Sequence, residues 1–434
     1  MSPEVVGVIG IVAMVVLLFL RVPVAIAMIG VGIAGFSVII NWKAALTRLG
    51  SDAFFAASLY SLSVIPLFIF MGLILAASAL GQDVYKAIDA FFWRIRGGLG
   101  IATIGASALF GAVSGSAVAS ATTMSVVAVP EMTRFDYDRG FAAATAATGG
   151  TLGILIPPSA ILVLYGVLTE EPIGQVLIGG IIPGILCTVL LMITAYLVVR
   201  ARPHYAPRPA EAPGLSRWDA TKLVWAVPVI FGISMGGIYF GIFTPTEAGA
   251  AGAFLSLAYA LLTRRMTWDG FKAAVSRTIR TTAFIFMLVI GGQFFGFFLS
   301  VSRIPIGLGE WIDALEIAPW IIVTLIFVVY FILGALMDEI AILVIMTPIM
   351  YPVIIALGYS GVWFGVLTIM MLLTGLLMPP VGLLCFVVAG VTKIPLGEIY
   401  RSIFPFVGAL AVAIMLVIFW PDLVTWLPNL MTTG

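Results

Sequence analysis

Charge, cysteine and histidine are all scarce in this sequence. Only 9 % of its 434 residues are charged, whereas an average soluble domain has about 25 %. A net charge of +1 gives no indication of nucleic-acid binding. Cys187 and Cys385 lie far apart in apolar runs, which argues against a disulfide or a zinc site. The single histidine, His204, falls in a polar segment, so histidine-based catalysis or metal binding is not expected.

Long apolar runs dominate the chain instead, since 62 % of the residues are hydrophobic. Runs of spanning length separated by short polar segments predict an all-α polytopic membrane protein. The N-terminus lacks the basic region of a signal peptide, so residues 5–20 are expected to remain as a span. We expect six parts, namely a scaffold hairpin with an interfacial helix at 1–63, a first repeat at 64–199, a cytoplasmic connector at 200–222, scaffold helices with an interfacial helix at 223–281, a second repeat at 282–420 and a C-terminal tail at 421–434.

A run of small residues, Gly111-Ala-Val-Ser-Gly-Ser-Ala-Val-Ala-Ser120, interrupts the apolar sequence. Irregular backbone at membrane depth is tolerated only inside protein or beside a water-filled cavity. Glycines let the chain turn back, and hydroxyl and carbonyl oxygens suit a hard cation. The run predicts a re-entrant hairpin over about 99–130, with Ser114, Gly115 and Ser116 at a tip that binds an ion or an anion. The alternative is a close helix–helix contact between small residues.

A second interruption follows in the next apolar run. Thr148, Gly149 and Thr151 precede the tandem prolines Pro157 and Pro158. Tandem proline removes two amide donors and blocks the continuation of a helix, which leaves carbonyl groups free. We therefore expect a broken helix here, with Pro157 at the break and the three preceding residues contributing to an ion or substrate site; the alternative is a hinge without a ligand.

The pattern of prolines occurs twice. Residues 130, 157, 158 and 183 are prolines, and so are residues 352, 379, 380 and 405, each 222 positions later. Phe68-Ile-Phe-Met71 also recurs at 284–287. We conclude that the two halves are duplicated, with a second hairpin over about 319–356. Thr374, Gly375, Pro379 and Pro380 are then the counterparts of the first break.

The basic residues indicate the orientation of the halves. If both hairpins are re-entrant and every other span crosses, 18 of the 21 Lys and Arg residues share one side, and the positive-inside rule makes that side cytoplasmic. The hairpins then enter from opposite faces, so the repeats are inverted. Inverted repeats with broken helices are typical of secondary transporters, whose sites lie near the midplane at the repeat interface.

Asp338 lies at the apex of the second hairpin. A carboxylate at that depth costs several kcal/mol unless it is paired or ion-bound. Coordination of a cation or compensation of a charge is therefore predicted, and the alternative is a solvated, inert carboxylate in an aqueous entry. The neighbouring Glu339 points in another direction on a helix and is a weaker candidate. The complete set of candidate cation ligands is Ser114, Ser116, Gly149, Asp338, Thr374 and Gly375.

Three stretches together resemble a known family. They are Phe110-Gly-Ala-Val-Ser-Gly-Ser-Ala, Gly149-Gly-Thr-Leu-Gly-Ile-Leu-Ile-Pro-Pro-Ser and Thr374-Gly-Leu-Leu-Met-Pro-Pro-Val-Gly. They resemble the large membrane subunit of tripartite ATP-independent periplasmic (TRAP) transporters, over nearly the whole chain. The resemblance implies a multi-pass protein of the bacterial inner membrane that imports an organic acid, such as a C4-dicarboxylate or sialic acid, by an elevator-type mechanism. It also implies Na⁺ as the coupling ion, at two or more sites and without an organic cofactor, a small four-helix membrane subunit and a periplasmic substrate-binding protein.

Two other functions were weighed. The first is a stand-alone sodium-carboxylate symporter of the wider ion-transporter group. The second is a membrane-embedded enzyme, which would need titratable groups converging in a cleft. Only Asp338 and Glu339 lie well within the apolar elements, so no enzyme is expected.

Overall fold

The protein is all-α in the residues that the computed structural model describes, which are 1–206, 214, 216–314 and 317–431. Five helices are long and apolar enough to cross a membrane, and two further pairs bent at a short break raise that number to seven. One of these bent pairs joins residues 139–155 to residues 160–169 at an angle of 42°. The predicted fold class, an all-α membrane protein with broken helices, is confirmed.

The first half of the chain contains α1 (Pro3–Phe19), α2 (Val24–Ile39), α3 (Trp42–Ser58), α4 (Val64–Ala77), α5 (Leu80–Phe92), α6 (Gly98–Ser114), α7 (Ala117–Arg134), α8 (Arg139–Leu155), α9 (Ala160–Thr169), α10 (Ile173–Gly179) and α11 (Ile181–Ala201). The second half contains α12 (Arg217–Leu223), α13 (Ala226–Tyr239), α14 (Pro245–Leu262), α15 (Trp268–Val301), α16 (Ile304–Ala314), α17 (Pro319–Gly334), α18 (Glu339–Ala356), α19 (Gly361–Gly375), α20 (Leu383–Thr392), α21 (Leu396–Phe419) and α22 (Asp422–Asn429).

The helix pattern repeats along the chain at the spacing of the prolines. Helix α18 begins and ends 222 positions after α7. The pairs α6 and α17, α8 and α19, and α9 and α20 follow the same offset to within two residues at each bound. Assignments of helix ends differ by this much on their own. Both halves therefore contain a hairpin followed by a broken helix, and the inverted relation between them stays a prediction.

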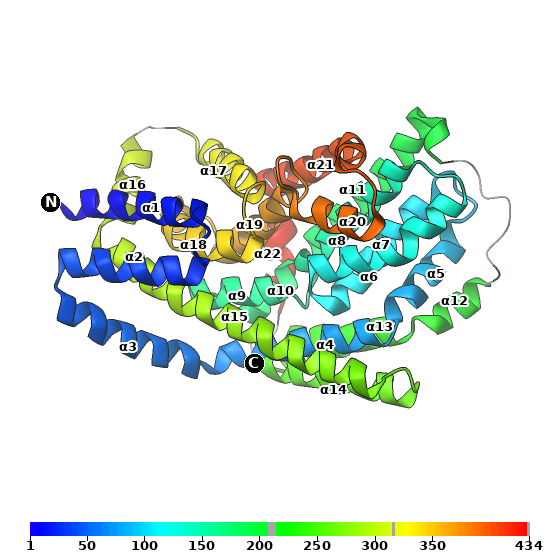
Figure 1. The fold of residues 1–434 in the computed structure, drawn as a ribbon, viewed down its shortest axis with the longest axis horizontal. Coiled ribbons are helices and arrows are strands. Elements are labelled where there is room, and N and C mark those ends of the chain that lie inside the picture. The colour runs from blue at the N-terminus through cyan, green and yellow to red at the C-terminus, as the bar shows by residue number, and fades with distance from the viewer. Residues whose placement is uncertain (207–213, 215, 315–316, 432–434) are drawn as a thin grey trace.

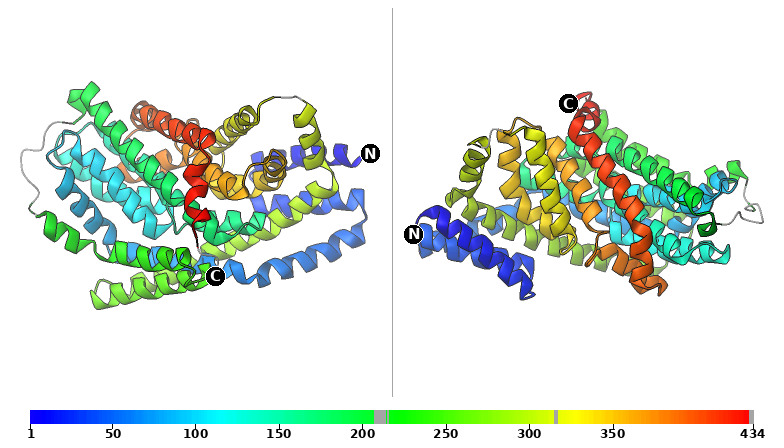
Figure 2. Two further views of the ribbon diagram at one scale, coloured as in Figure 1. Left: turned by 180° about the vertical axis from the view of Figure 1, so that it is seen from behind. Right: turned by 90° about the horizontal axis from the view of Figure 1, so that it is seen from above.

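The two hairpins lie in different parts of the molecule and converge near its centre (Figure 1). The α6–α7 hairpin occupies the right half of that view, and α17 and α18 lie left of the centre. Helix α15 runs obliquely past both and packs against α2 and α4. The views from behind and from above show the same long, flattened shape (Figure 2).

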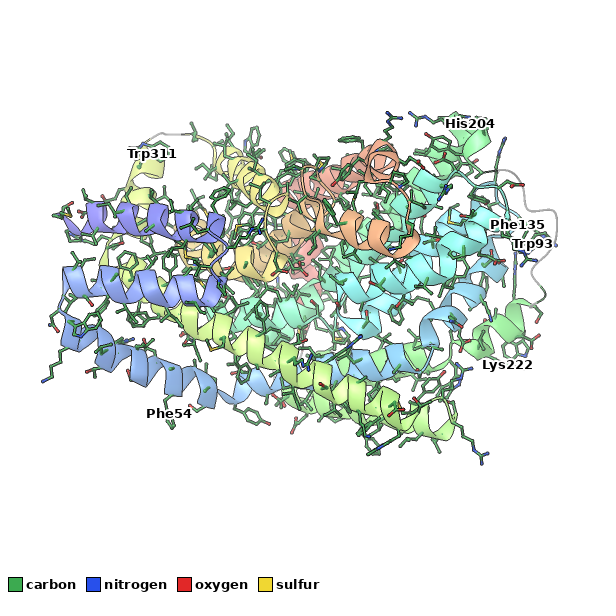
Figure 3. The ribbon with its side chains drawn as sticks, in the orientation of Figure 1. Phe54, Trp93, Phe135, His204, Lys222 and Trp311 are labelled. Carbon is green, nitrogen blue, oxygen red and sulfur yellow. The ribbon has the colours of Figure 1, made fainter. Side chains whose placement is uncertain are left out.

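Residues on either side of the α6–α7 hairpin lie at one end of the molecule, together with residues of the 200–222 connector. Trp93, Phe135 and Lys222 lie at the right end in Figure 3, with His204 above them, and Trp311 lies near the opposite end. A single continuous span over residues 99–130 would place Trp93 and Phe135 at opposite ends. Their position at the same end supports a hairpin that turns back.

One helix differs from its predicted extent. The basic segment ending at 281 was expected to lie at the interface, apart from a span beginning at 282. Instead, Trp268–Val301 is a single helix of 34 residues. Arg277 and Arg280 are therefore part of the helix that passes the centre of the molecule, a position that matters for the site below.

Helix α5 is strongly amphipathic and packs its apolar face against α6 and α7. Its Asp89 has a buried carboxylate oxygen without a hydrogen-bond partner among the described residues. Burial, with a smaller contribution from Glu131, raises the pKa of Asp89 from 3.8 to about 6. A raised pKa in the folded state stabilises the fold at low pH, and that contribution disappears as the pH rises through about 6.

We expect Asp89→Asn to raise the melting temperature at about pH 8, where the ionised carboxylate opposes folding, and to leave it unchanged at about pH 4. Thermal unfolding of the purified protein at the two pH values measures this. Glu310→Gln, at an exposed position in α16, is the matched control. An equal effect of the two substitutions at both pH values would contradict the role of Asp89.

Candidate functional site

The tip of the first hairpin is a tight turn at the predicted residues. Helix α6 ends at Ser114, and Gly115 has a φ of +61°, which favours glycine. Ser116 then caps α7, because its side-chain oxygen accepts a hydrogen bond from the Ala119 amide at 3.3 Å. A Cβ atom on Gly115 would lie 2.7 Å from the carbonyl oxygen of Pro158. The tip therefore contacts the tandem prolines directly.

Pairs of glycines connect each hairpin to its broken helix. A Cβ atom on Gly111 would lie 2.8 Å from the Cα of Gly153, and one on Gly334 would lie 2.8 Å from the Cα of Gly375. Gly375 lies 222 positions after Gly153, and Gly334 lies 223 positions after Gly111, so the two contacts are equivalent in the two halves. Close packing of small residues, the alternative explanation for the first stretch, is thus correct for Gly111, while Ser114–Ser116 form the turn.

The first helix break lies at the tandem prolines, and the three candidate ligands that precede it lie inside the helix. Thr148, Gly149 and Thr151 lie inside α8, which continues to Leu155. Thr151 donates a hydrogen bond to the Thr148 carbonyl at 2.7 Å, and a Cβ atom on Gly149 would lie 2.4 Å from the Ser107 hydroxyl oxygen. Glycine weakens a helix without ending it, whereas tandem proline ends it. The chain leaves the helix only at residues 156–159.

The second break follows the same plan. Thr374 and Gly375 are the last residues of α19, and the Thr374 hydroxyl donates to the Met370 carbonyl at 2.9 Å. Pro379 and Pro380 follow the helix, and the peptide bond between them is cis, as is the Pro157–Pro158 bond. Both pairs of prolines therefore lie in the breaks where they were predicted.

Asp338 caps the helix that follows the second tip. Its carboxylate accepts hydrogen bonds from the Ile340 amide at 3.0 Å and the Ala341 amide at 3.3 Å. It occupies the position 222 residues after Ser116, the cap of α7. The positive end of the helix dipole compensates the charge of this carboxylate. The structure therefore adds a capping role to the predicted one.

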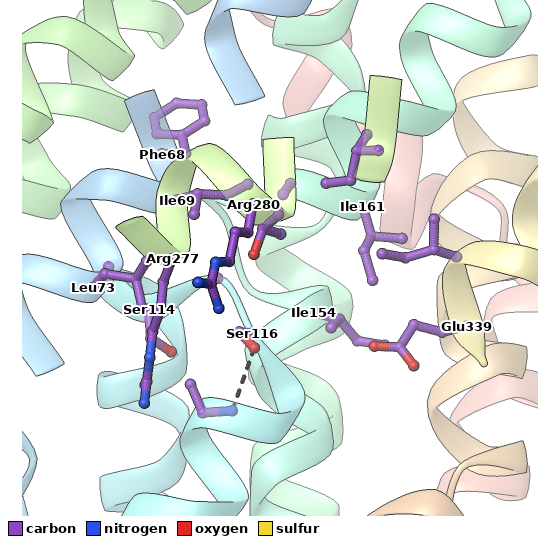
Figure 4. A pocket seen from close by; sticks show the side chains of 17 residues that line it. Phe68, Ile69, Leu73, Ser114, Ser116, Ile154, Ile161, Arg277, Arg280 and Glu339 are labelled. Atoms are coloured by element: carbon purple, nitrogen blue, oxygen red, sulfur yellow. Dashed lines mark hydrogen bonds between the residues drawn. The ribbon is translucent and has the colours of Figure 1, made fainter. Parts of the chain in front are cut away.

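A cavity of about 360 Å³ lies where the two hairpins, the first break, α4 and α15 meet. Its polar lining residues are Ser114, Ser116, Arg277, Arg280, Thr281 and Glu339. In Figure 4 the two arginine side chains extend from α15 toward Ser114 and Ser116, and Glu339 lies on the opposite wall near Ile154. This volume and the few convergent polar groups are typical of a small-molecule site.

Two residues that line the cavity, and one residue of α8, have a buried side-chain oxygen without a hydrogen-bond partner. Within the described part of the chain, the Ser114 hydroxyl and one Glu339 carboxylate oxygen lack a hydrogen bond, and so does the hydroxyl of Thr148. Buried polar atoms are nearly always paired in native proteins, so unpaired ones need a specific explanation such as an ion. The described residues contain no group of three His, Cys, Asp or Glu side chains, and a sodium site of hydroxyl and carbonyl oxygens would need none.

The structure brings only part of the predicted set to the cavity. Ser114, Gly115 and Ser116 line it. The other candidates are not among the residues that line the cavity; they are Thr148, Gly149, Thr151, Pro157, Asp338, Thr374, Gly375, Pro379 and Pro380. Arg277 and Arg280 also line the cavity, although the sequence predicts an interfacial position for their segment. Their spacing of three, which places both on one face of a helix, was the available signal.

Two helical hairpins, two broken helices and a central cavity with few polar groups define a multi-pass membrane transporter. The architecture resembles the YdaH transporter of Alcanivorax borkumensis with a TM-score of 0.59, covering 88 % of this chain and 89 % of that one at 15 % identity. At that identity the likeness concerns the fold alone.

The family model of the tripartite ATP-independent periplasmic transporter, DctM component, matches residues 11–423. The chain belongs to this family. It is 33 % identical to the C4-dicarboxylate TRAP transporter large permease protein DctM of Pseudomonas aeruginosa, covering 85 % of this chain and 86 % of that one. It is 30 % identical to the sialic acid TRAP transporter large permease protein SiaM of Vibrio cholerae, covering 95 % and 96 %. The protein is therefore a multi-pass transporter permease of the bacterial inner membrane and not an enzyme, as the sequence predicted.

Proposed function

We propose that this chain is the translocating subunit of a sodium-coupled importer of an organic acid anion. The observation that carries the proposal is the cavity, in which two arginine side chains face the tip of the first hairpin. Guanidinium groups suit carboxylates because they donate paired hydrogen bonds in a planar fork. C4-dicarboxylates and sialic acid, which the names of the two relatives give as cargo, are acids of this kind.

Sodium coupling is supported by the chemistry of the first tip. The Ser114 hydroxyl is buried without a hydrogen-bond partner. The carbonyl groups at the C-terminus of a helix such as α6 lack amide donors from further turns of the helix. Hydroxyl and carbonyl oxygens are the ligands that a hard monovalent cation needs. We place Na⁺ at this tip, with further ligands drawn from the second tip and the two breaks, as the sequence predicted.

An elevator-type movement is supported by the packing. The glycine pairs hold each hairpin against its broken helix, so these elements would move together as one body. The cavity lies between this body and the long helices α4 and α15. Inverted repeats would let the two halves exchange conformations and expose the cavity to either side. A small four-helix membrane subunit and a periplasmic binding protein, as the tripartite family name suggests, would complete the transporter.

Uptake into proteoliposomes tests the proposal. With the small subunit and the binding protein present, an inward Na⁺ gradient is expected to drive accumulation of a labelled organic acid, and an equal K⁺ gradient is not. Accumulation that is the same with either cation would contradict sodium coupling. Full uptake without a binding protein would instead favour a stand-alone symporter.

Replacing both Ser114 and Ser116 by alanine is expected to raise the Na⁺ concentration for half-maximal uptake by about tenfold, since one lost contact to a charged group is worth roughly 1.5–3 kcal/mol. Ser125→Ala, which removes a hydroxyl of α7 bonded to the Ala121 carbonyl, is the matched control. Ser116→Ala alone measures the loss of the cap. An unchanged Na⁺ requirement in the double variant would reduce the tip to a packing element.

A further inference from the structure

The cavity has a cationic side that no acidic group neutralises. Arg277 and Arg280 lie three residues apart on α15 and line it. Across the described residues, the ion pairs are Arg48–Asp52, Arg134–Glu131 and Arg265–Asp83, so neither arginine of the cavity is in one. In Figure 4 their side chains extend toward the tip at Ser114 and Ser116. That tip joins the C-terminus of α6 to the N-terminus of α7, so it carries partial charges of both signs.

Glu339 is the acidic residue among those that line the opposite wall, and it follows the cap residue Asp338 in the same helix. Glu339 is 7 % exposed, and one of its carboxylate oxygens has no hydrogen-bond partner within the described chain. Ile154, Ile161 and Ile340 line the cavity on this side. A buried acceptor without a partner is costly, so this oxygen is available to a ligand that brings a donor.

The two sides make different demands on a ligand. A carboxylate placed between Arg277 and Arg280 satisfies the cationic side. A second carboxylate at the other end has no hydrogen to donate to the carboxylate oxygen of Glu339 that lacks a partner. A hydroxyl or ammonium group at that end would instead donate to Glu339.

We propose, on the basis of the transport function above, that Arg277 and Arg280 bind one carboxylate of the cargo while Glu339 accepts a hydrogen bond from a donor at its other end. The cavity therefore selects monocarboxylates that carry hydroxyl or ammonium groups over C4-dicarboxylates that lack them. Glu339 and the arginine pair determine this specificity. The names of the relatives leave the choice open, because they include both kinds of acid.

Direct binding to the full-length chain tests this selectivity without a binding protein. The purified protein in lipid nanodiscs with saturating Na⁺ would be titrated with gluconate, sialic acid and β-alanine, and with succinate and fumarate. At least one of the three donor-bearing monocarboxylates is expected to bind about tenfold or more tightly than either dicarboxylate. Equal or tighter binding of a dicarboxylate, or no binding by any of the five acids, would overturn the proposal.

Three variants assign the roles. Arg277→Gln and Arg280→Gln are each expected to weaken binding of the preferred acid at least tenfold. Glu339→Gln is expected to weaken binding of the preferred acid and to strengthen binding of succinate. The ratio between the two affinities would therefore become smaller. Lys272→Gln, at an exposed position of the same helix outside the cavity, is the control and should change neither. A Glu339→Gln protein with the wild-type preference and an altered Na⁺ requirement would make Glu339 an ion ligand and overturn its role here.

The outcome is separable from that of the proposed function. If the selectivity is wrong but the function is right, sodium-driven uptake of an organic acid persists, with dicarboxylates as the better cargo. If the proposed function itself is wrong, no acid is accumulated under a Na⁺ gradient, whichever of the five binds.

Discussion

Substitution of Gly375 by alanine is expected to destabilise the protein by about 3 kcal/mol, at the upper end of the range for overpacked cores. The added Cβ would lie 2.6 Å from the Cα of Gly334, and 3.0 Å from its carbonyl carbon. These are backbone atoms, so a rotamer change cannot relieve the clash and the two helices must separate. Separation also strains the hydrogen bond from the Val381 amide to the Ala335 carbonyl, which is 3.2 Å long and lies at the same crossing.

Thermal unfolding in detergent measures this effect, and Gly390 supplies the control. Gly390 lies in α20 with no atom within 4 Å of an added Cβ, so alanine there should be neutral or stabilise the helix by up to about 1 kcal/mol. Gly111→Ala, at the equivalent crossing of the first half, should resemble Gly375→Ala. If alanine at 375 and at 390 had the same melting temperature, the helices at this crossing would have to be less closely packed than described.

The architecture was accessible from sequence because its main determinants are local. Tandem prolines end a helix wherever they occur, and their recurrence at an offset of 222 identified the breaks and the duplication. A glycine between two serines marked the first turn, which the structure places at Gly115. Local signals of this kind therefore determine where these helices end and turn.

The composition of the site was less accessible because it depends on packing between distant elements. Gly149 is a predicted ligand before the first break, but it lies inside α8, where an added Cβ would be 2.4 Å from the Ser107 hydroxyl oxygen of α6. Arg277 and Arg280 belong to a basic segment typical of the interface, and only the course of α15 brings them to the cavity. Asp338 could have been recognised as a cap, since aspartate is favoured at that position and its counterpart Ser116 caps α7.

The capping role of Asp338 makes it possible to test its predicted ion role separately. Asparagine caps a helix about as well as aspartate, whereas alanine costs about 1 kcal/mol. Asp338→Asn therefore keeps the hydrogen bonds to the Ile340 and Ala341 amides and removes only the charge. We expect Asp338→Asn to melt near the wild-type temperature and to lose at least about tenfold in sodium-driven uptake, because each 1.4 kcal/mol of lost ion binding is a factor of ten. Asp338→Ala should lose the same uptake and some stability as well.

Asp138 provides the same chemical change away from both hairpin tips. It caps α8 by accepting a hydrogen bond from the Phe141 amide at 2.8 Å, and it is not among the residues that line the cavity. Asp138→Asn should leave both the melting temperature and the Na⁺ requirement of uptake unchanged. If Asp338→Asn behaved in the same way, the carboxylate at the second tip would serve as a cap alone. The Na⁺ ligands would then have to come from the hydroxyl and carbonyl oxygens of the first tip, where Ser114 has its unpaired hydroxyl.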